Sequence, residues 1–193
     1  MKKRLGIYIH IPFCASKCSY CDFYSLAGCE HMMPDYQDAL LAHIEESSNA
    51  IKNYEVDTVY FGGGTPSLLT PAQAERLIRA AEPVPGAEIT LEANPETVTE
   101  ESLRGFRAAG VNRISFGVQS ARDTQLRTLG RPHSAKQARA AFAAARRAGR
   151  PLYCPLYHVQ PLCKARPTLR IALQTLANIL LIVDSCKTFC LQR

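Results

Sequence analysis

Apolar residues in the first 149 positions recur with two different periods, and these periods alternate along the chain. Alternating or continuous β-branched and aromatic runs predict strands, whereas apolar positions three and four residues apart predict amphipathic helices. The predicted strands cover residues 5–11, 56–61, 88–94 and 111–118. The predicted helices cover residues 34–53, 70–81, 99–110 and 134–149, and residues 120–123 open a further short helix. This order is typical of βαβ units, so the chain is predicted to be an α/β protein.

Three of these helices begin at residues that can cap a helix. Thr70 and Gln73 form a capping box, in which each side chain accepts a hydrogen bond from the backbone amide of the other residue. Ser134 and Gln137 repeat the same box, and Thr99 is a third candidate cap. The helix starts are therefore predicted more sharply than the helix ends.

The chain has 193 residues, enough for one substantial core but fewer than the roughly 200–250 residues of a complete α/β barrel. Short, right-handed connections would curl the four predicted strands into part of a barrel. The loops that follow the strands would then gather at its carboxyl rim, where such folds bind their ligands. We therefore expect about four βα units of a partial TIM-like barrel.

The net charge of +6 is concentrated at one end of the chain. Residues 1–149 hold 17 Lys and Arg against 16 Asp and Glu, a balance of +1, whereas residues 150–193 hold 6 against 1, a balance of +5. The main body is therefore not expected to bind nucleic acid. No apolar run approaches membrane-spanning length, so no membrane span is expected.

Cysteines indicate a reducing compartment and a metal site. Four of the eight cysteines lie within residues 14–29, and residues 1–4 lead into a strand without the apolar stretch of a signal peptide. A cytoplasmic location is therefore expected. Cys29 and His31 follow in a short connection, where a lone cysteine and a lone histidine are more often packing or surface residues than metal ligands.

Cys14, Cys18 and Cys21 have CxxxCxxC spacing and directly follow the first predicted strand. A structural zinc site needs four ligands, usually as two distant CxxC pairs, and no second pair is present. A 4Fe-4S cluster held by three cysteines instead leaves one iron open to a small molecule. The spacing therefore predicts a 4Fe-4S cluster bound by these three thiolates.

A CxxxCxxC loop after a strand resembles the signature of the radical S-adenosylmethionine (SAM) enzymes. The resemblance implies that the open iron is chelated by the amino and carboxylate groups of SAM. It also implies that the cluster passes an electron to the sulfonium, giving methionine and a 5'-deoxyadenosyl radical. The expected fold becomes a partial radical SAM (β/α)6-type barrel.

Four further motifs carry the resemblance: Gly-Gly-Gly-Thr-Pro-Ser at residues 62–67, Leu-Glu-Ala-Asn-Pro-Glu at 91–96, Gly-Val-Gln-Ser at 117–120 and Leu-Gly-Arg-Pro-His at 129–133. The family pattern places the SAM amino group at the glycines, the methionine end near Tyr8 and the adenine against Tyr20. The SAM contacts that the resemblance implies are Tyr8, Tyr20, Gly63, Gly64, Thr65, Glu92, Gln119 and Arg131. As bare residue types, these would be core or surface residues.

The lead Tyr-Ile-His-Ile-Pro-Phe at residues 8–13 is similar to the group that contains the HemW haem chaperones and the oxygen-independent coproporphyrinogen III oxidases. The oxidases usually carry a fourth cysteine at the position of Phe23, and this departure favours the chaperone group. The implied role is binding of haem or porphyrin and delivery of haem to recipient haem proteins, with a reductant such as flavodoxin or ferredoxin. The alternatives are oxidative decarboxylation of a porphyrinogen and an inactive truncated fragment. His10 and His133 are candidate haem ligands.

The resemblance ends near Gly149. Residues 150–193 contain four cysteines and one acidic residue, and residues 169–183 could form one apolar helix. We expect residues 1–149 to form the barrel part and residues 150–193 to be a tail foreign to the fold, for example from a shifted reading frame. The barrel would then end at four strands with an exposed edge.

Overall fold

The computed structural model describes residues 2–18, 20–149 and 180–184, and its centre is a mixed sheet of five strands in the order β6-β5-β4-β1-β7. The four strands β1, β4, β5 and β6 are parallel, and β7 pairs antiparallel with β1. The strands of this sheet are β1 (Lys3–Ile11), β4 (Tyr54–Gly63), β5 (Glu88–Ala93), β6 (Arg113–Phe116) and β7 (Leu180–Asp184). The parallel strands lie where the hydrophobic pattern predicts them.

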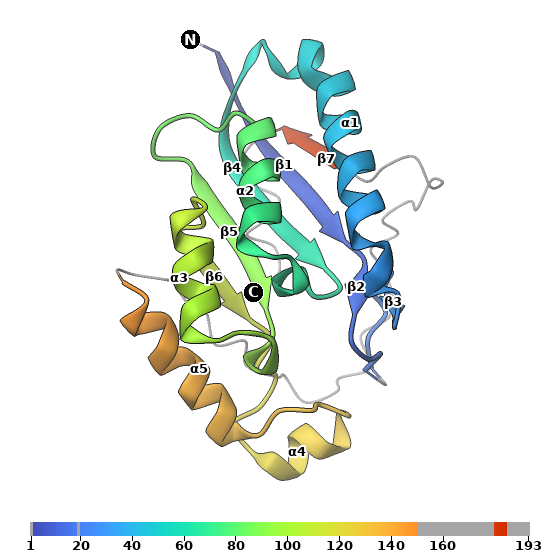
Figure 1. Ribbon diagram of the computed structural model, residues 1–193, viewed down its shortest axis with the longest axis vertical. Helices are drawn as coiled ribbons and strands as arrows, with labels where there is room; N and C mark the ends of the chain where they lie inside the picture. The colour runs from blue at the N-terminus through green and yellow to red at the C-terminus, as the bar shows by residue number, and fades with distance from the viewer. Residues whose placement is uncertain (1, 19, 150–179, 185–193) are drawn as a thin grey trace.

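Helices cover one face of the sheet, as Figure 1 shows. The long helices are α1 (Met33–Ile51), α2 (Pro71–Ala80), α3 (Glu100–Ala108) and α5 (Ala135–Arg147), and α4 (Asp123–Thr128) lies beyond the ends of the strands. Single 3-10 turns are η1 (Glu30–Met32), η2 (Pro66–Leu68) and η3 (Pro95–Thr97). Both predicted capping boxes are confirmed, and Thr99 forms a third one with Ser102.

The core lies between the sheet and these helices. Ile7, Ile9 and Ile11 of β1 are fully buried and alternate with the half-buried Tyr8 and His10, as the two faces of a strand require. The same alternation in β4 and β5 buries Phe61 and Leu91 completely. Burial of these apolar side chains is the main contribution to the stability of the sheet.

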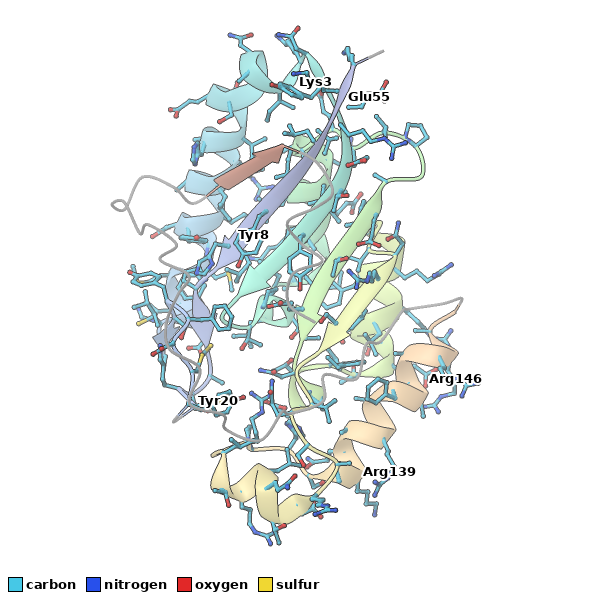
Figure 2. The ribbon with its side chains drawn as sticks, turned by 180° about the vertical axis from the view of Figure 1, so that it is seen from behind. Lys3, Tyr8, Tyr20, Glu55, Arg139 and Arg146 are labelled. Atoms are coloured by element: carbon cyan, nitrogen blue, oxygen red, sulfur yellow. The ribbon has the colours of Figure 1, made fainter. Side chains whose placement is uncertain are left out.

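The opposite face of the sheet is largely polar. Register places Tyr8 beside Tyr60, Tyr60 beside Thr90, and Glu92 beside Ser115. Figure 2 looks onto this face, where Tyr8 projects from β1. In a barrel this would be the inner face, so the polar residues lie where a ligand would be enclosed.

A small two-stranded sheet extends the carboxyl end of β1. β2 (Phe13–Cys14) pairs in parallel with β3 (Leu26–Ala27). The amide of Leu26 donates to the Pro12 carbonyl at 2.6 Å, and the amide of Gly28 donates to the Cys14 carbonyl at 3.3 Å. These bonds close the cysteine-bearing segment into a loop, which we call the cluster loop (residues 15–25).

The end of the chain differs from the sequence expectation. Residues 180–184 form β7, so the predicted apolar helix over residues 169–183 is wrong at its end, while residues 169–179 lie outside the described part. A short apolar run fits either a helix or a strand by itself, and here pairing with β1 decides for a strand. The sheet therefore has five strands rather than four, and β6 is the edge without a further partner among the described residues. A domain boundary at Gly149 stays a prediction.

None of the helices in the described residues is long and apolar enough to cross a membrane.

Candidate functional site

The cluster loop is held together by its own polar contacts. Lys17 donates from Nζ to the Phe23 carbonyl at 2.8 Å and to Ser25 Oγ at 3.0 Å. The amide of Cys21 donates to the Cys18 carbonyl at 3.1 Å. Cys14 is buried, Cys18 and Cys21 are half-buried, and all three are free thiols.

A continuous hydrogen-bond chain connects two of the predicted ligands. Arg131 Nη2 donates to Asn94 Oδ1 at 2.7 Å, Asn94 Nδ2 donates to Thr65 Oγ1 at 3.2 Å, and Thr65 Oγ1 donates to Cys14 Sγ at 3.5 Å. From the same guanidinium, Nη1 donates to Cys18 Sγ at 3.4 Å. The bonds run from the Arg131 guanidinium to two of the sulfurs, and hydrogen bonds to the ligand sulfurs are one of the factors that tune an iron–sulfur cluster.

One donor of Arg131, the Nε group, is buried and makes no hydrogen bond to the described residues. Because a buried donor is rarely left unsatisfied, this nitrogen is suited to an acceptor atom of a bound ligand. Tyr20 lies within hydrogen-bonding reach of the same side chain, at the end of the molecule toward which the strands point in Figure 2.

The predicted glycine motif joins the end of β4 to the end of β1 and to β2 by backbone contacts. The amides of Gly64 and Thr65 donate to the carbonyls of Ile11 and Phe13, both at 2.8 Å. A Cβ atom on Gly64 would lie 2.6 Å from the Phe13 carbonyl oxygen and 3.0 Å from Cys14 Sγ. The glycine is therefore required by the fold itself, and its contact with a cofactor stays a prediction.

Gly63 has a different requirement. Its φ of +116° lies in a region that side chains rarely adopt, and a Cβ atom would lie 2.6 Å from the His10 ring. The His10 ring is in turn fixed, because Nδ1 is 3.2 Å from Tyr8 Oη and Nε2 is 3.0 Å from the Tyr24 carbonyl oxygen. Burial lowers the pKa of His10, although the bond to Tyr24 partly opposes this. Both ring nitrogens are engaged, which leaves neither of them available as an axial ligand in this arrangement.

Glu92 lies in a protected position on the polar face. Tyr60 donates from its hydroxyl to Glu92 Oε1 at 2.6 Å, and the rings of Tyr60 and Tyr8 stack with centroids 6.0 Å apart. Burial raises the pKa of the Glu92 carboxyl, and hydrogen bonds from Tyr60 and the Gly63 amide offset only part of this rise. Burial and the nearby Glu92 carboxylate also raise the pKa of Tyr8. The carboxylate of Glu92 would gain from a cationic or hydrogen-bond-donating ligand.

Replacing Glu92 with glutamine is expected to raise the thermal stability of the cofactor-free protein at neutral pH. Because the folded-state pKa is raised, the unfolded chain ionises first, and stability falls as pH rises through the folded-state pKa. Glutamine stays neutral and keeps an oxygen for the Tyr60 hydroxyl. The gain in melting temperature should be present at pH 7 and vanish below about pH 4, where both side chains are neutral. Thermal unfolding across this pH range measures it, and a variant less stable than the parent at pH 7 would contradict it.

His133 and Glu96 form a second buried contact near Arg131. His133 is 2% exposed, with Nδ1 3.0 Å from Glu96 Oε2 and Nε2 3.0 Å from the Val118 carbonyl oxygen. Both ring nitrogens of this candidate haem ligand are therefore occupied. Burial raises the pKa of Glu96, but the hydrogen bond from His133 and the Arg131 charge lower it more, so the net shift is downward.

The structure brings most of the sequence-predicted residues to one end of the sheet, and the Arg131 chain reaches two of the three predicted cysteine ligands. Among the described residues, no three His, Cys, Asp or Glu side chains lie closely enough to hold a metal ion. Cys29 contacts the Ala27 carbonyl at 3.7 Å, apart from the Arg131 chain. The motifs in the sequence did not single out Asn94 or Tyr60 as site residues. Asn94 lies in the same motif as Glu92, and Tyr60 follows from strand alternation, so both signals were present in the sequence.

Comparisons with known proteins identify the family of these motifs. The family model of the radical SAM superfamily matches residues 8–170, which extends beyond Gly149. The heme chaperone HemW of Escherichia coli (strain K12) is 46% identical over 143 residues, covering 71% of this chain and 38% of that protein. The mitochondrial radical S-adenosyl methionine domain-containing protein 1 of Bos taurus is 40% identical over 151 residues, covering 75% of this chain and 34% of that protein. The chain thus spans well under half the length of these relatives.

A solved structure supports the fold. Coproporphyrinogen III oxidase (HemN) from Escherichia coli, a radical SAM enzyme, superposes with a TM-score of 0.69 at 29% sequence identity. The match covers 77% of this chain and 35% of that chain. Together with the four parallel strands, this confirms the predicted partial TIM-like barrel.

Proposed function

Because this chain belongs to the radical SAM superfamily, we propose that it binds a 4Fe-4S cluster through Cys14, Cys18 and Cys21 and SAM beside it, and serves as a haem chaperone of the HemW type. The observation that carries the proposal is the hydrogen-bond chain from Arg131 through Asn94 and Thr65 to the cysteine sulfurs. An ordinary set of reduced cysteines has no need of a buried guanidinium and a donor chain directed at sulfur.

The donor set fits the cluster in chemical type. Three free thiols supply three ligands, and Thr65 and Arg131 supply hydrogen bonds to two of them. When bound, the cluster supplies the electron that cleaves the sulfonium of SAM.

The SAM site is proposed at the carboxyl ends of β4, β5 and β6. Glu92 offers a carboxylate whose burial favours a donor partner, and the buried Nε of Arg131 offers a donor to an acceptor. Gly63 and Gly64 lie at the end of β4 and Gln119 follows β6, while Tyr8 of β1 and Tyr20 are the proposed aromatic contacts. These are the contacts that the family resemblance implies.

The chaperone role is favoured over decarboxylation by two observations. The similar proteins named above include heme chaperones, with 46% identity for that of Escherichia coli. Phe23 is 58% exposed at the position where the oxidases usually carry a fourth cysteine. The proposal extends to a cytoplasmic location, to haem or porphyrin as ligand, and to recipient haem proteins and a reductant such as flavodoxin or ferredoxin as partners. Coproporphyrinogen oxidation is kept as the second function because of the likeness to HemN.

Anaerobic reconstitution with iron and sulfide tests these functions. The first expectation is about four irons per chain, with an electron paramagnetic resonance spectrum of the reduced cluster that changes when SAM is added. Haem titration and transfer to an apo haem protein test the chaperone role, and chromatography of a porphyrinogen reaction tests decarboxylation. A chain that holds no cluster, or a cluster indifferent to SAM, overturns the cofactor assignment. Decarboxylated product without haem transfer overturns the chaperone role.

A further inference from the structure

The segment that follows β6 contains an uncommon backbone arrangement. The amide of Val118 donates to the Phe116 carbonyl at 2.9 Å, and the amide of Ser120 donates to the Val118 carbonyl at 2.8 Å. Two three-residue turns therefore follow each other directly. The second has Gln119 at its centre with φ +67°, which is the rarer and strained form of the γ-turn. A non-glycine residue in this conformation persists only where its surroundings hold it.

Two side chains from the segment before α5 hold this turn. Arg131 Nη2 donates to the Gly117 carbonyl at 2.6 Å, and His133 Nε2 donates to the Val118 carbonyl at 3.0 Å. Their spacing of two residues matches that of Asn94 and Glu96, which contact Arg131 and His133 respectively. The result is a pair of parallel contacts that fixes two successive carbonyls ahead of Gln119.

Glu96 sets the orientation of the His133 ring. The carboxylate lies 3.0 Å from Nδ1, on the far side of the ring from the Val118 carbonyl. Nε2 therefore donates to the Val118 carbonyl, while Nδ1 lies against the Glu96 carboxyl. The charged groups acting on this contact are Glu96 and Arg131.

We propose that His133, oriented by Glu96, is a positioning residue that holds Gln119 in its left-handed conformation and so prepares the SAM site. The inference rests on the proposed SAM site, since Gln119 is one of the contacts that the family resemblance implies there. The proposal gives His133 no direct contact with SAM. It acts through the Val118 carbonyl, which it shares with the Ser120 amide.

The test compares two replacements of similar size, His133→Gln and His133→Met. Glutamine keeps N–H donors, whereas methionine removes them and leaves the Val118 carbonyl with the Ser120 amide alone. SAM affinity of the cluster-loaded protein is measured by equilibrium dialysis, and hydrogen exchange of the Ser120 amide is measured in the cofactor-free protein. His133→Met is expected to weaken SAM binding about tenfold, the equivalent of one buried hydrogen bond. It should also speed exchange at Ser120, while His133→Gln stays within about threefold of the parent for both.

Ile44→Val on α1 is the control for general loss of stability. Ile44 is 2% exposed, and its helix α1 covers the β1 side of the sheet, at the opposite side from β6 in Figure 1. Equal affinities in the methionine and glutamine variants overturn the inference, as does an equal loss of SAM binding in Ile44→Val. A parent protein that binds no SAM overturns the proposed function and the cofactor half of this inference. Exchange at Ser120 then still decides whether His133 holds the turn.

Discussion

Alanine at Cys14, Cys18 or Cys21 is expected to abolish the iron–sulfur cluster, which is the largest effect expected for any single substitution in this chain. The proposed cluster has only three thiolates as protein ligands, and one of its irons already has no protein ligand. Loss of one cysteine therefore leaves a second iron without a protein ligand. Iron and sulfide content after anaerobic reconstitution, together with visible absorbance, should fall to background for each variant.

Cys29→Ala is the matched control for these variants. Cys29 is also a free, half-buried thiol, but it contacts the Ala27 carbonyl rather than the Arg131 chain. Its replacement should leave iron content and absorbance at the parent level. Loss of the cluster in Cys29→Ala, or its retention in Cys18→Ala, would assign the ligands differently from our proposal.

Gly64→Ala is expected to have the second largest effect, because it forces apart the two segments that build the site. The added methyl group would lie 2.6 Å from the Phe13 carbonyl oxygen, which is backbone and cannot rotate away. Overpacking of this kind typically costs about 1–3 kcal/mol in the free energy of unfolding. Because Cys14 Sγ is also only 3.0 Å from that position, cluster assembly should fail before the protein unfolds. Urea unfolding and iron content of the same preparation measure the two effects.

Gly86→Ala separates backbone strain from crowding. Gly86 has φ +84° and no atom within 4 Å of the added methyl group, and it lies before β5, at the opposite end of that strand from the site. This variant should lose about 1 kcal/mol of stability, as expected for alanine in a left-handed conformation, and keep its cluster. If both variants keep full iron content, the close approach of Gly64 to Phe13 and Cys14 is not needed for cluster assembly.

The parallel strands and helix starts were predictable because each depends on local chemistry. Alternation in residues 88–94 predicted β5 nearly to the residue, and the Thr70 and Ser134 boxes fixed the starts of α2 and α5. The end of the chain was harder. Residues 180–183 are an apolar run that suits a helix or a strand, and only pairing with the edge of β1, far away in sequence, selects the strand.

The candidate site was predictable in its residue types but not in its connections. Cysteine spacing alone predicted three ligands, and the motifs named Thr65 and Arg131. No local pattern revealed that Asn94 joins these two side chains, because the three residues come from different βα units. The left-handed Gln119 was likewise hidden, since glycine or asparagine is the usual signal for that conformation. Contacts between strand ends arise only when the sheet is assembled.

β7 has a consequence for how this sheet can grow. A barrel of parallel strands closes when its last strand pairs with its first, and here that pairing would have to form on the edge of β1 that faces away from β4. β7 already pairs with this edge in the antiparallel direction, with Leu180 opposite Ile9 and Asp184 opposite Leu5. A further strand could pair with this edge of β1 only after the hydrogen bonds between β7 and β1 are broken. β7 therefore blocks closure of the barrel for as long as it stays paired.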